Sequence, residues 1–266
     1  MTLRICVAGA TGWTGSSLIP AILDTPDLTL VGAVARRSAG QDIGVAAGRA
    51  AAGVTIVASL ADALAVPTDV LIDYTKPEVV KGHVLTAIER GVSVVIGTSG
   101  LTAEDYTQIE VKARERGVGV IAAGNFSLTA ALLQHFALQA AAQLPQWEII
   151  DYAGAGKTDV PSGTARELAE RMGAVKKPEI TVPVDRLHGH RETRGAEIQG
   201  VRVHSVRLPG FVLSCEAVFG LPGERLVIRH DAGESATPYV SGTLLAARRA
   251  PQVKGLVRGL DTLLFR

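Results

Sequence analysis

Residues 150–165 read IDYAGAGKTDVPSGTA and bring together side chains that can bind a small anion and deliver a proton to it. Lys157 precedes a Pro-Ser-Gly-Thr turn, and the sequence after this turn is typical of a helix. Backbone amides at a helix N-terminus bind carboxylates and phosphates, so we expect an anion to contact Gly163 and Thr164. The alternative interpretation is a capped turn with a surface lysine.

The elements that position such a site begin with a strand, a glycine turn and a helix at the start of the chain. Residues 3–8 (LRICVA) have the pattern of a buried parallel strand, and residues 16–26 have helical apolar spacing. In this context GATGWTG predicts a dinucleotide site: Gly9 permits the turn, Gly12 admits the pyrophosphate, and Gly15 allows close packing. The alternative is a glycine-rich turn without a ligand.

The end of the next strand indicates which dinucleotide binds. Residues 28–35 form an apolar run, and Arg36 and Arg37 follow where NAD-preferring sites carry an acid for the ribose 2′-hydroxyl. Two guanidinium groups suit a 2′-phosphate instead. We predict NADPH as the cofactor, with NADH as the alternative. A solvated basic loop is the other interpretation of the two arginines.

Strands continue to alternate with helical segments up to residue 127, which predicts a doubly wound α/β domain of the Rossmann type. Ligands of such sheets bind at the carboxyl ends of the strands. Three of these ends are polar or small, as a nicotinamide ribose requires: residues 73–75, 97–99 and 124–127.

The pattern changes after residue 127. A long apolar helix at 128–144 leads to the quoted segment and then to short alternating runs, which predict an open mixed or antiparallel sheet. These runs are 197–208, 211–219 and 224–232. We predict domains at 1–127 and 128–238, with final helices at 239–251 and 253–264 that pack back onto the first domain.

The composition excludes several classes of protein. The 266 residues are 47% hydrophobic and 20% charged, as in a globular protein with a good core. A net charge of +1 and 4% aromatic residues argue against nucleic-acid binding. No apolar run reaches the ~18 residues of a membrane span, and no signal-peptide pattern is present. We expect a soluble cytoplasmic protein without a metal, in which Cys6 is a small core residue.

Seven motifs share the order and spacing of the dihydrodipicolinate reductase family, which the chain resembles over essentially its whole length. The motif K-x-D-x-P-S-G-T-A is far more specific to this family than the glycine turn is. The seven are GATGWTG (9–15), IDYTKPE (72–78), VIGTSGLT (95–102), GNFS (124–127), KTDVPSGTA (157–165), HSVRLPG (204–210) and FGLPGERLVIRHDA (219–232).

The resemblance implies NAD(P)H-dependent reduction of a cyclic, imine-forming dicarboxylate, 4-hydroxy-tetrahydrodipicolinate, in lysine and diaminopimelate biosynthesis. It implies that the second domain binds substrate and that its sheet builds a homotetramer. It assigns Lys157 as the catalytic lysine and places a substrate carboxylate on Ser162, Gly163 and Thr164. The cofactor-binding residues that it implies are Gly9, Ala10, Thr11, Gly12, Trp13, Thr14, Gly15, Arg36, Arg37, Gly97, Thr98, Ser99, Ala123, Gly124, Asn125 and Phe126.

The substrate side departs from the family pattern. Ala153 and Gly154 replace two histidines, of which the first is the family's proton donor and the second helps to bind substrate. A His-Gln pair is replaced by Ser214 and Cys215, and an arginine is replaced near Ser235. The cofactor side is almost intact.

These departures leave the proton donor and the substrate open. Water, Lys157, Tyr152, His188 or His190 are the candidate donors. The chain is then the lysine-pathway reductase with a rearranged acid, a reductase of a different imine or oxo acid, or a nucleotide-binding homologue without catalysis. Retention of all three glycines of the first turn argues against the last of these.

Overall fold

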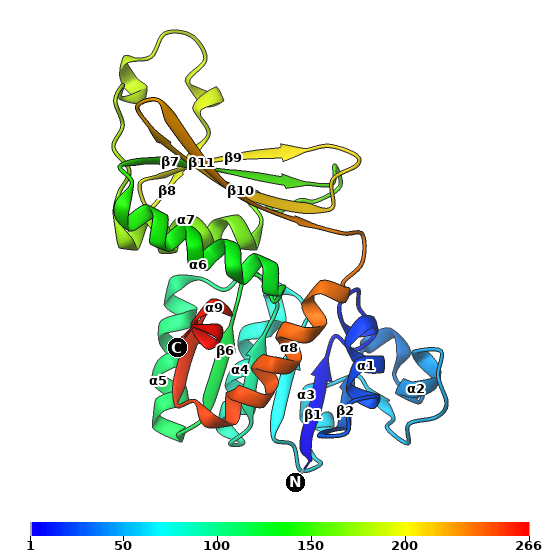
Figure 1. The fold of residues 1–266 in the computed structure, drawn as a ribbon. Helices are drawn as coiled ribbons and strands as arrows, with labels where there is room; N and C mark the ends of the chain where they lie inside the picture. The colour runs from blue at the N-terminus through cyan, green and yellow to red at the C-terminus, as the bar shows by residue number, and fades with distance from the viewer. Residues whose placement is uncertain (1, 266) are drawn as a thin grey trace. The chain divides into compact units, whose positions relative to one another are not determined.

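The computed structural model describes residues 2–265, which form two compact units (Figure 1). The first unit contains the chain up to Leu128 and again from Ser235 onward, and the second contains Thr129–Glu234. The C-terminal segment therefore returns to the unit in which the chain begins.

A seven-stranded parallel sheet forms the centre of the first unit, in the order β12-β6-β5-β4-β1-β2-β3. Its strands are short apolar runs, and the three neighbours β4, β5 and β6 are buried along their whole length. Continuous burial of this kind is typical of a parallel sheet that is covered on both faces. The strands are β1 (Leu3–Ala8), β2 (Leu28–Val34), β3 (Ile56–Val57), β4 (Val70–Asp73), β5 (Ser93–Ile96), β6 (Gly119–Ala122) and β12 (Gly255–Arg258).

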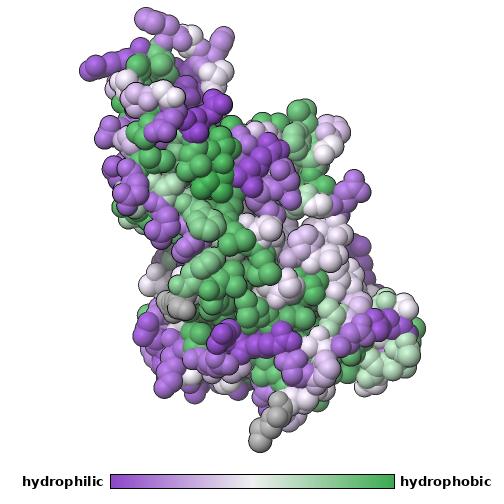
Figure 2. Space-filling model, in the orientation of Figure 1, coloured by the Kyte–Doolittle hydropathy of each residue, from purple (hydrophilic) through white to green (hydrophobic). Residues whose placement is uncertain are grey.

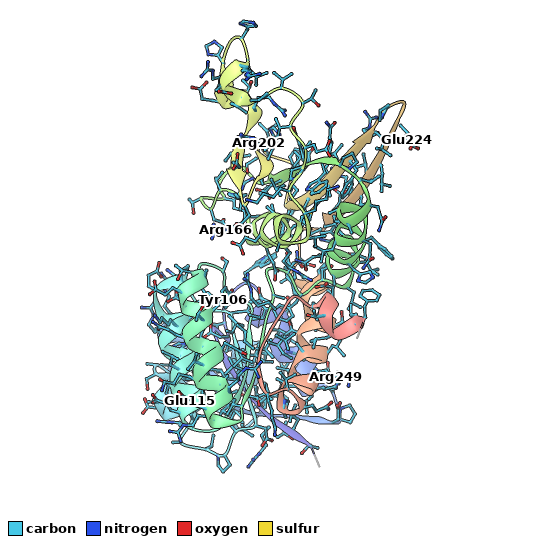
Figure 3. All side chains as sticks on the ribbon, turned by 90° about the vertical axis from the view of Figure 1, so that its left-hand side faces the viewer. Tyr106, Glu115, Arg166, Arg202, Glu224 and Arg249 are labelled. Carbon is cyan, nitrogen blue, oxygen red and sulfur yellow. The ribbon has the colours of Figure 1, made fainter. Side chains whose placement is uncertain are left out.

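Helices connect these strands, and the arrangement confirms the predicted doubly wound α/β class. They are α1 (Gly15–Leu23), α2 (Ile43–Ala46), α3 (Leu60–Ala63), α4 (Pro77–Glu89), α5 (Ala103–Arg116), α8 (Thr237–Arg249) and α9 (Asp261–Leu264), with short 3₁₀ turns η1 (Arg36–Ser38) and η4 (Ala250–Gln252). Helix α5, which carries Tyr106 and Glu115 in Figure 3, shows how the sequence sets its ends. Thr102 and Asp105 form a capping box at its start, and Gly117 ends it in a left-handed conformation.

The core of the first unit contains Cys6, as predicted, and burial raises the pKa of its thiol to about 12. The predicted helix over residues 253–264 is wrong. Residues 255–258 form the edge strand β12, which pairs in parallel with β6, and only α9 is helical. Burial alternates along β12, and the glycines at its start and just after its end, Gly255 and Gly259, have positive φ angles that interrupt a helix.

The second unit is built on a five-stranded mixed sheet in the order β11-β10-β7-β9-β8, as the alternating runs predict. Only β7 and β9 are parallel. The strands are β7 (Gln146–Ala153), β8 (Ala196–Ile198), β9 (Val201–Arg207), β10 (Leu213–Leu221) and β11 (Glu224–Ala232). The run 197–208 is a hairpin rather than one strand, because Gln199 and Gly200 both have positive φ and turn the chain between β8 and β9.

The two faces of this sheet differ, and we call them the inner and outer faces. On β7 the inner residues Trp147, Ile149, Asp151 and Ala153 are buried, while the alternate residues are only partly covered. Helices α6 (Leu128–Gln143) and α7 (Gly163–Val175) pack on the inner face. Two 3₁₀ turns, η2 (Val184–Arg186) and η3 (Arg191–Arg194), lie in the segment between α7 and β8. None of the helices in residues 2–265 has the length and apolarity to cross a membrane.

Candidate active site

The glycine turn between β1 and α1 is closed so tightly that two of its glycines cannot carry a side chain. Gly9 has a φ of +81°, and a Cβ there would lie 2.2 Å from the carbonyl oxygen of Tyr74. A Cβ on Gly15 would lie 2.2 Å from the carbonyl oxygen of Gly9. The turn is held by a bond of 2.9 Å from the Gly12 amide to that same oxygen. Because neither glycine has a side chain, a ligand at the turn can approach the backbone closely.

Helix α1 begins without a side-chain cap, because Thr14 at its N-cap position makes no such bond. The backbone N–H groups of Thr11, Trp13, Thr14 and Gly15 find no acceptor within residues 2–265. Unpaired amides at the start of a helix, together with its dipole, attract phosphate. Trp13 belongs to this turn, and 56% of its surface is exposed. Its ring lies edge-on to that of Tyr239, with 5.7 Å between the ring centroids.

Arg36 and Arg37 lie in η1, directly after β2, as the sequence predicts for a dinucleotide site. Both side chains are exposed, and neither is paired with a carboxylate in the part of the chain that the structure describes. A second anion can therefore bind here without first breaking an ion pair.

The tips of β4 and β5 are joined by a buried carboxylate. Asp73 accepts bonds from the amide and hydroxyl of Thr75, at 3.0 and 2.6 Å, and from the Thr98 hydroxyl at 2.8 Å. The Nδ1 atom of His83 lies 2.8 Å from its second oxygen. Thr98 is thus committed to this network, and the neighbouring Ser99 is the exposed hydroxyl at the tip.

Four more of the predicted cofactor residues, at positions 123–126, lie in the loop between β6 and α6. Ala123 and Asn125 are partly exposed and Gly124 is exposed, whereas the ring of Phe126 is 1% exposed and packs edge-on against Tyr74 at 6.2 Å. Phe126 belongs to the core, so only its backbone is available to a ligand. At the tip of β5, a Cβ on Gly97 would lie 2.1 Å from the Tyr74 ring, so this position also requires glycine.

These segments follow β1, β4, β5 and β6, which are neighbours in the sheet and run in the same direction. They therefore meet at one edge. The strand order reverses between β1 and β4, which is the position where ligands bind in open α/β sheets. The residues present fit a dinucleotide.

The closed turn should not tolerate a side chain at Gly9. Gly9→Ala places a Cβ against Tyr74 at a positive φ, which costs about 1–3 kcal/mol of strain before the clash is counted. We expect its NADPH affinity to fall by at least ~10-fold, or about 1.4 kcal/mol. Binding can be followed by fluorescence of Trp13, with a Trp13→Phe variant to separate its signal from that of Trp147.

Gly40→Ala is the matched control, because Gly40 has a φ of +91° with nothing within 4 Å of its Cβ position. It carries the conformational strain without the close contact. Equal NADPH affinity in Gly9→Ala and Gly40→Ala would contradict the role assigned to the turn.

In the second unit, Asp151 is the centre of the hydrogen-bond network around the predicted anion site. It is fully buried on the inner face. Its carboxylate accepts from the amide and hydroxyl of Ser162, at 3.0 and 2.6 Å, and from the Ser205 hydroxyl at 3.1 Å. The guanidinium of Arg207 donates to it at 2.8 Å. A buried carboxylate needs this degree of pairing.

Ser162 is the N-cap of α7, which begins at Gly163, so the three residues predicted to hold an anion lie at a helix N-terminus, which is called the cradle below. The Ser162 side chain accepts from the amide of Ala165. Lys157 lies earlier in the same loop, half-buried, with its Nζ 2.7 Å from the Asp159 carboxylate. The lysine, the cradle and Asp151 thus belong to one continuous segment.

The structure excludes one of the candidate proton donors. Tyr152 lies on the outer face, where its hydroxyl donates to Glu216 at 3.2 Å and its ring stacks on Phe211 at 5.1 Å. Burial and the Glu216 carboxylate raise the pKa of Tyr152. Since Asp151 lies on the opposite face, Tyr152 cannot reach the cradle.

The positions of the missing histidines hold no acid. Ala153 is fully buried, and a Cβ on Gly154 would meet the Phe211 carbonyl at 3.1 Å. His188 and His190 lie in the segment before η3, and both are exposed.

Two residues that the sequence analysis did not assign lie on the inner face with Asp151. The first is Arg207. Side chains alternate along β9, so its position in that strand could have predicted that it lies on the inner face. His230 is the other, since Cys215 of β10 pairs with both Asp151 and His230. Its Nδ1 is 3.0 Å from the Thr129 hydroxyl, its buried Nε2 has no partner within residues 2–265, and burial lowers its pKa.

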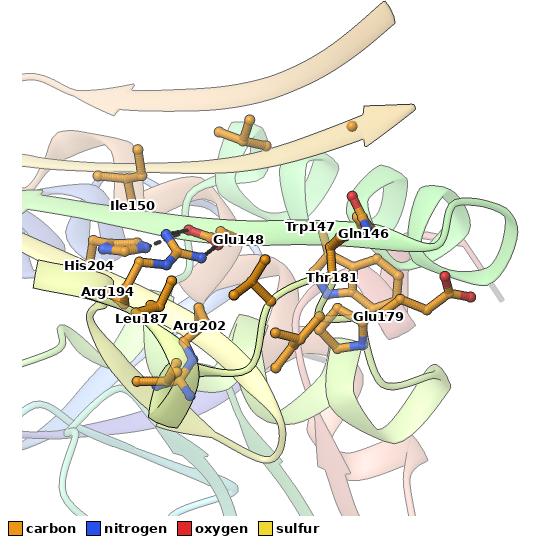
Figure 4. Close-up of a pocket in the computed structure, with 16 residues that line it drawn as sticks. Gln146, Trp147, Glu148, Ile150, Glu179, Thr181, Leu187, Arg194, Arg202 and His204 are labelled. Atoms are coloured by element: carbon orange, nitrogen blue, oxygen red, sulfur yellow. Dashed lines mark hydrogen bonds and ion pairs between the residues drawn. The ribbon is translucent and has the colours of Figure 1, made fainter. Parts of the chain in front are cut away.

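A separate pocket of about 560 Å³ lies on the outer face (Figure 4). Glu148 is its central charge and is bonded to Arg194 and, at 2.6 Å, to His204. Burial alone would raise the pKa of Glu148, but these two partners lower it on balance. The pocket contains none of the predicted site residues. No group of three or more potential metal ligands occurs in residues 2–265.

A doubly wound sheet with a glycine turn at its switch point is typical of NAD(P)H-dependent oxidoreductases, and here a second domain follows in which Lys157 lies in the loop before a helix N-terminus. Family models for the N-terminus and the C-terminus of dihydrodipicolinate reductase match residues 3–126 and 129–264. The chain belongs to the dihydrodipicolinate reductase family.

Individual relatives of known name support the same family assignment. The chain is 42% identical to a 4-hydroxy-tetrahydrodipicolinate reductase of Moorella thermoacetica, over 99% of this chain and 98% of the relative. It is 38% identical to the same enzyme of Desulfitobacterium hafniense, over 98% of each chain. A solved structure of dipicolinate-bound dihydrodipicolinate reductase from Paenisporosarcina sp. TG-14 matches with a TM-score of 0.76 and 30% identity, covering 98% of this chain and 99% of the other.

Proposed function

We propose that the protein reduces 4-hydroxy-tetrahydrodipicolinate to tetrahydrodipicolinate with NAD(P)H, a step of lysine and diaminopimelate biosynthesis. The observation that carries this proposal is the segment from Lys157 to Thr164, in which a lysine and a capped helix N-terminus occur together in a chain that both family models match. A cyclic dicarboxylate matches this site, because it offers an anion for the helix and an imine for the lysine.

The residues of the second unit have distinct tasks in this reaction. The first turn of α7, at Ser162, Gly163 and Thr164, holds one substrate carboxylate. Lys157 belongs to the loop that leads into α7, where its ammonium supplies the proton that the reaction consumes. When bound, NAD(P)H would supply the hydride, and the 4-hydroxyl group would leave with one proton as water, so that the product keeps one C=N bond in its ring. No histidine is required, since an ammonium is itself a proton donor.

The preferred cofactor in this proposal is NADPH. Arg36 and Arg37 are exposed and unpaired within the described chain, at the position of the 2′-phosphate. Unlike a carboxylate, they do not repel that group, and they can form charge-assisted bonds to it.

We also propose that the protein is a homotetramer that acts in the cytoplasm. The outer face of the second unit supports assembly through its sheet. It carries apolar residues, including Ile150, Val218 and the exposed Val227, which pairs with Val218 in register. Figure 2 shows apolar surface among polar side chains over these strands. A second copy of the sheet would bury this face.

Genetic complementation tests the proposed activity. A bacterium that lacks its own reductase requires diaminopimelate, and the chain should restore growth without it. Lys157→Ala, produced at the same level, should fail to do so. Absence of growth with the unaltered chain would contradict the proposal.

A reductase of a different imine or oxo acid is the second candidate. It is favoured by Ala153 and Gly154, which leave the anion cradle and the lysine but remove two polar contacts to substrate. In that case complementation fails while NADPH binding is retained.

A further inference from the structure

The two parts of the substrate segment are joined through a single side chain. Arg207, on β9, donates from Nη2 both to the Asp151 carboxylate and to the backbone carbonyl of Asp159, each at 2.8 Å. Its Nη1 donates to the carbonyl of Val206 at 3.0 Å. The side chain is only 15% exposed, so this guanidinium links two parts of the unit rather than lying free on the surface, and this link is called the joint below.

On one side of this joint is the lysine. The carbonyl of Asp159 is bonded to Arg207, while its carboxylate is 2.7 Å from the Nζ of Lys157. Fixing the backbone of Asp159 therefore fixes the carboxylate that holds the ammonium. Within the same loop, the Lys157 amide also donates to the carbonyl of Gly154 at 3.0 Å.

On the other side of the joint is the anion cradle. Asp151 is bonded to both the amide and the hydroxyl of Ser162, and Ser162 caps α7. Because Arg207 bonds to both Asp151 and Asp159, it links the lysine loop to the start of α7 and so helps to set the distance between them. A misplacement of about 1 Å can cost ~10²-fold in rate, so such a distance matters for catalysis.

We propose that Arg207 is a positioning residue for the reduction: it sets the Lys157 ammonium relative to the carboxylate cradle on α7. This inference rests on the proposed function. Lysine cannot replace arginine here, because its Nζ lies one bond closer to the backbone than Nη2 does, and because a single nitrogen cannot also make the Nη1 bond to Val206. It does keep a cation beside the buried Asp151, which protects the fold.

Arg207→Lys is the test, and Arg202→Lys is the matched control. Arg202 lies on the same strand and is equally buried, but it points to the outer face and pairs with Glu197 at 3.1 Å (Figure 3). We expect kcat for Arg207→Lys to fall by ~10- to 100-fold. Its NADPH affinity and its melting temperature should remain close to those of Arg202→Lys.

A double-mutant cycle with Lys157→Ala separates positioning from general damage. If Arg207 acts through the lysine, Arg207→Lys lowers kcat much less when Lys157 is already absent. An equal loss of kcat in both backgrounds, or an unchanged kcat in Arg207→Lys alone, would overturn the inference.

Binding of dipicolinate distinguishes this result from failure of the proposed function, because it needs no turnover. The unaltered chain and Arg202→Lys should bind dipicolinate with equal affinity, and Arg207→Lys should bind ~10-fold more weakly. Equal binding by all three overturns the role of Arg207 alone. If the unaltered chain neither binds dipicolinate nor reduces the pathway substrate, the proposed function fails and this inference fails with it.

Discussion

Replacing Lys157 by alanine is expected to lower kcat for the reduction by ~10²–10⁴-fold, the usual contribution of a positioned proton donor. The effect should be large because the family's histidine position is Ala153, which has no proton to donate, and because Tyr152 lies on the opposite face of the sheet. Lys157 is held 2.7 Å from Asp159 and lies in the same loop as the cradle. Steady-state kinetics with purified protein measure the change.

Three further measurements make this result specific. NADPH affinity should be unchanged, since Lys157 lies in the second unit and the glycine turn lies in the first. Lys177→Ala, a lysine after the end of α7, should retain full activity. A small primary amine added to Lys157→Ala should restore part of the rate. A loss of kcat below ~10-fold would mean that water supplies the proton.

The largest expected effect on the cofactor side comes from Arg36→Ala combined with Arg37→Ala. A hydrogen bond to a charged group contributes about 1.5–3 kcal/mol, so each arginine that bonds the 2′-phosphate should lower the KM for NADPH by roughly 10- to 150-fold. Removal of each such arginine should raise that KM by the same factor, so the double variant should show at least a ~10-fold increase. The KM for NADH should barely change, because NADH has no 2′-phosphate. The two arginines are exposed and follow β2, so the double variant should keep its melting temperature.

Arg49→Ala is the control for this pair. It removes a cation from the same unit, but Arg49 is already paired with Asp24 at 2.5 Å. It should affect NADPH and NADH equally little. Equal losses for both cofactors in the double variant would show that the arginines support the loop rather than recognise the phosphate.

Local patterns in the sequence predicted most of the first unit. The strand, glycine turn and helix from residue 3 to residue 23 depend on neighbours in the chain, so apolar spacing and glycine positions identify them. The edge strand β12 was missed for the opposite reason. Its four residues become a strand only because β6, more than a hundred residues earlier, offers a free edge.

The same distinction holds for the candidate site. Lys157 and the cradle at Ser162 are close in sequence and were predicted together. Arg207, which joins them, is 56 residues from Asp151, and only the pairing of β7 with β9 brings the two side chains together. Alternation along β9 places Arg207 on the inner face, but it does not say which strand lies beside it.

We expect this chain to reduce the pathway substrate without the histidine of the family pattern. That ability is tested most directly by following NADPH oxidation by the purified protein, with the cyclic substrate generated in situ from pyruvate and aspartate semialdehyde by the preceding synthase. The expected result is turnover that requires the synthase, exceeds that with NADH, and is largely lost in Lys157→Ala. NADPH binding without any turnover of this substrate would contradict the proposed function.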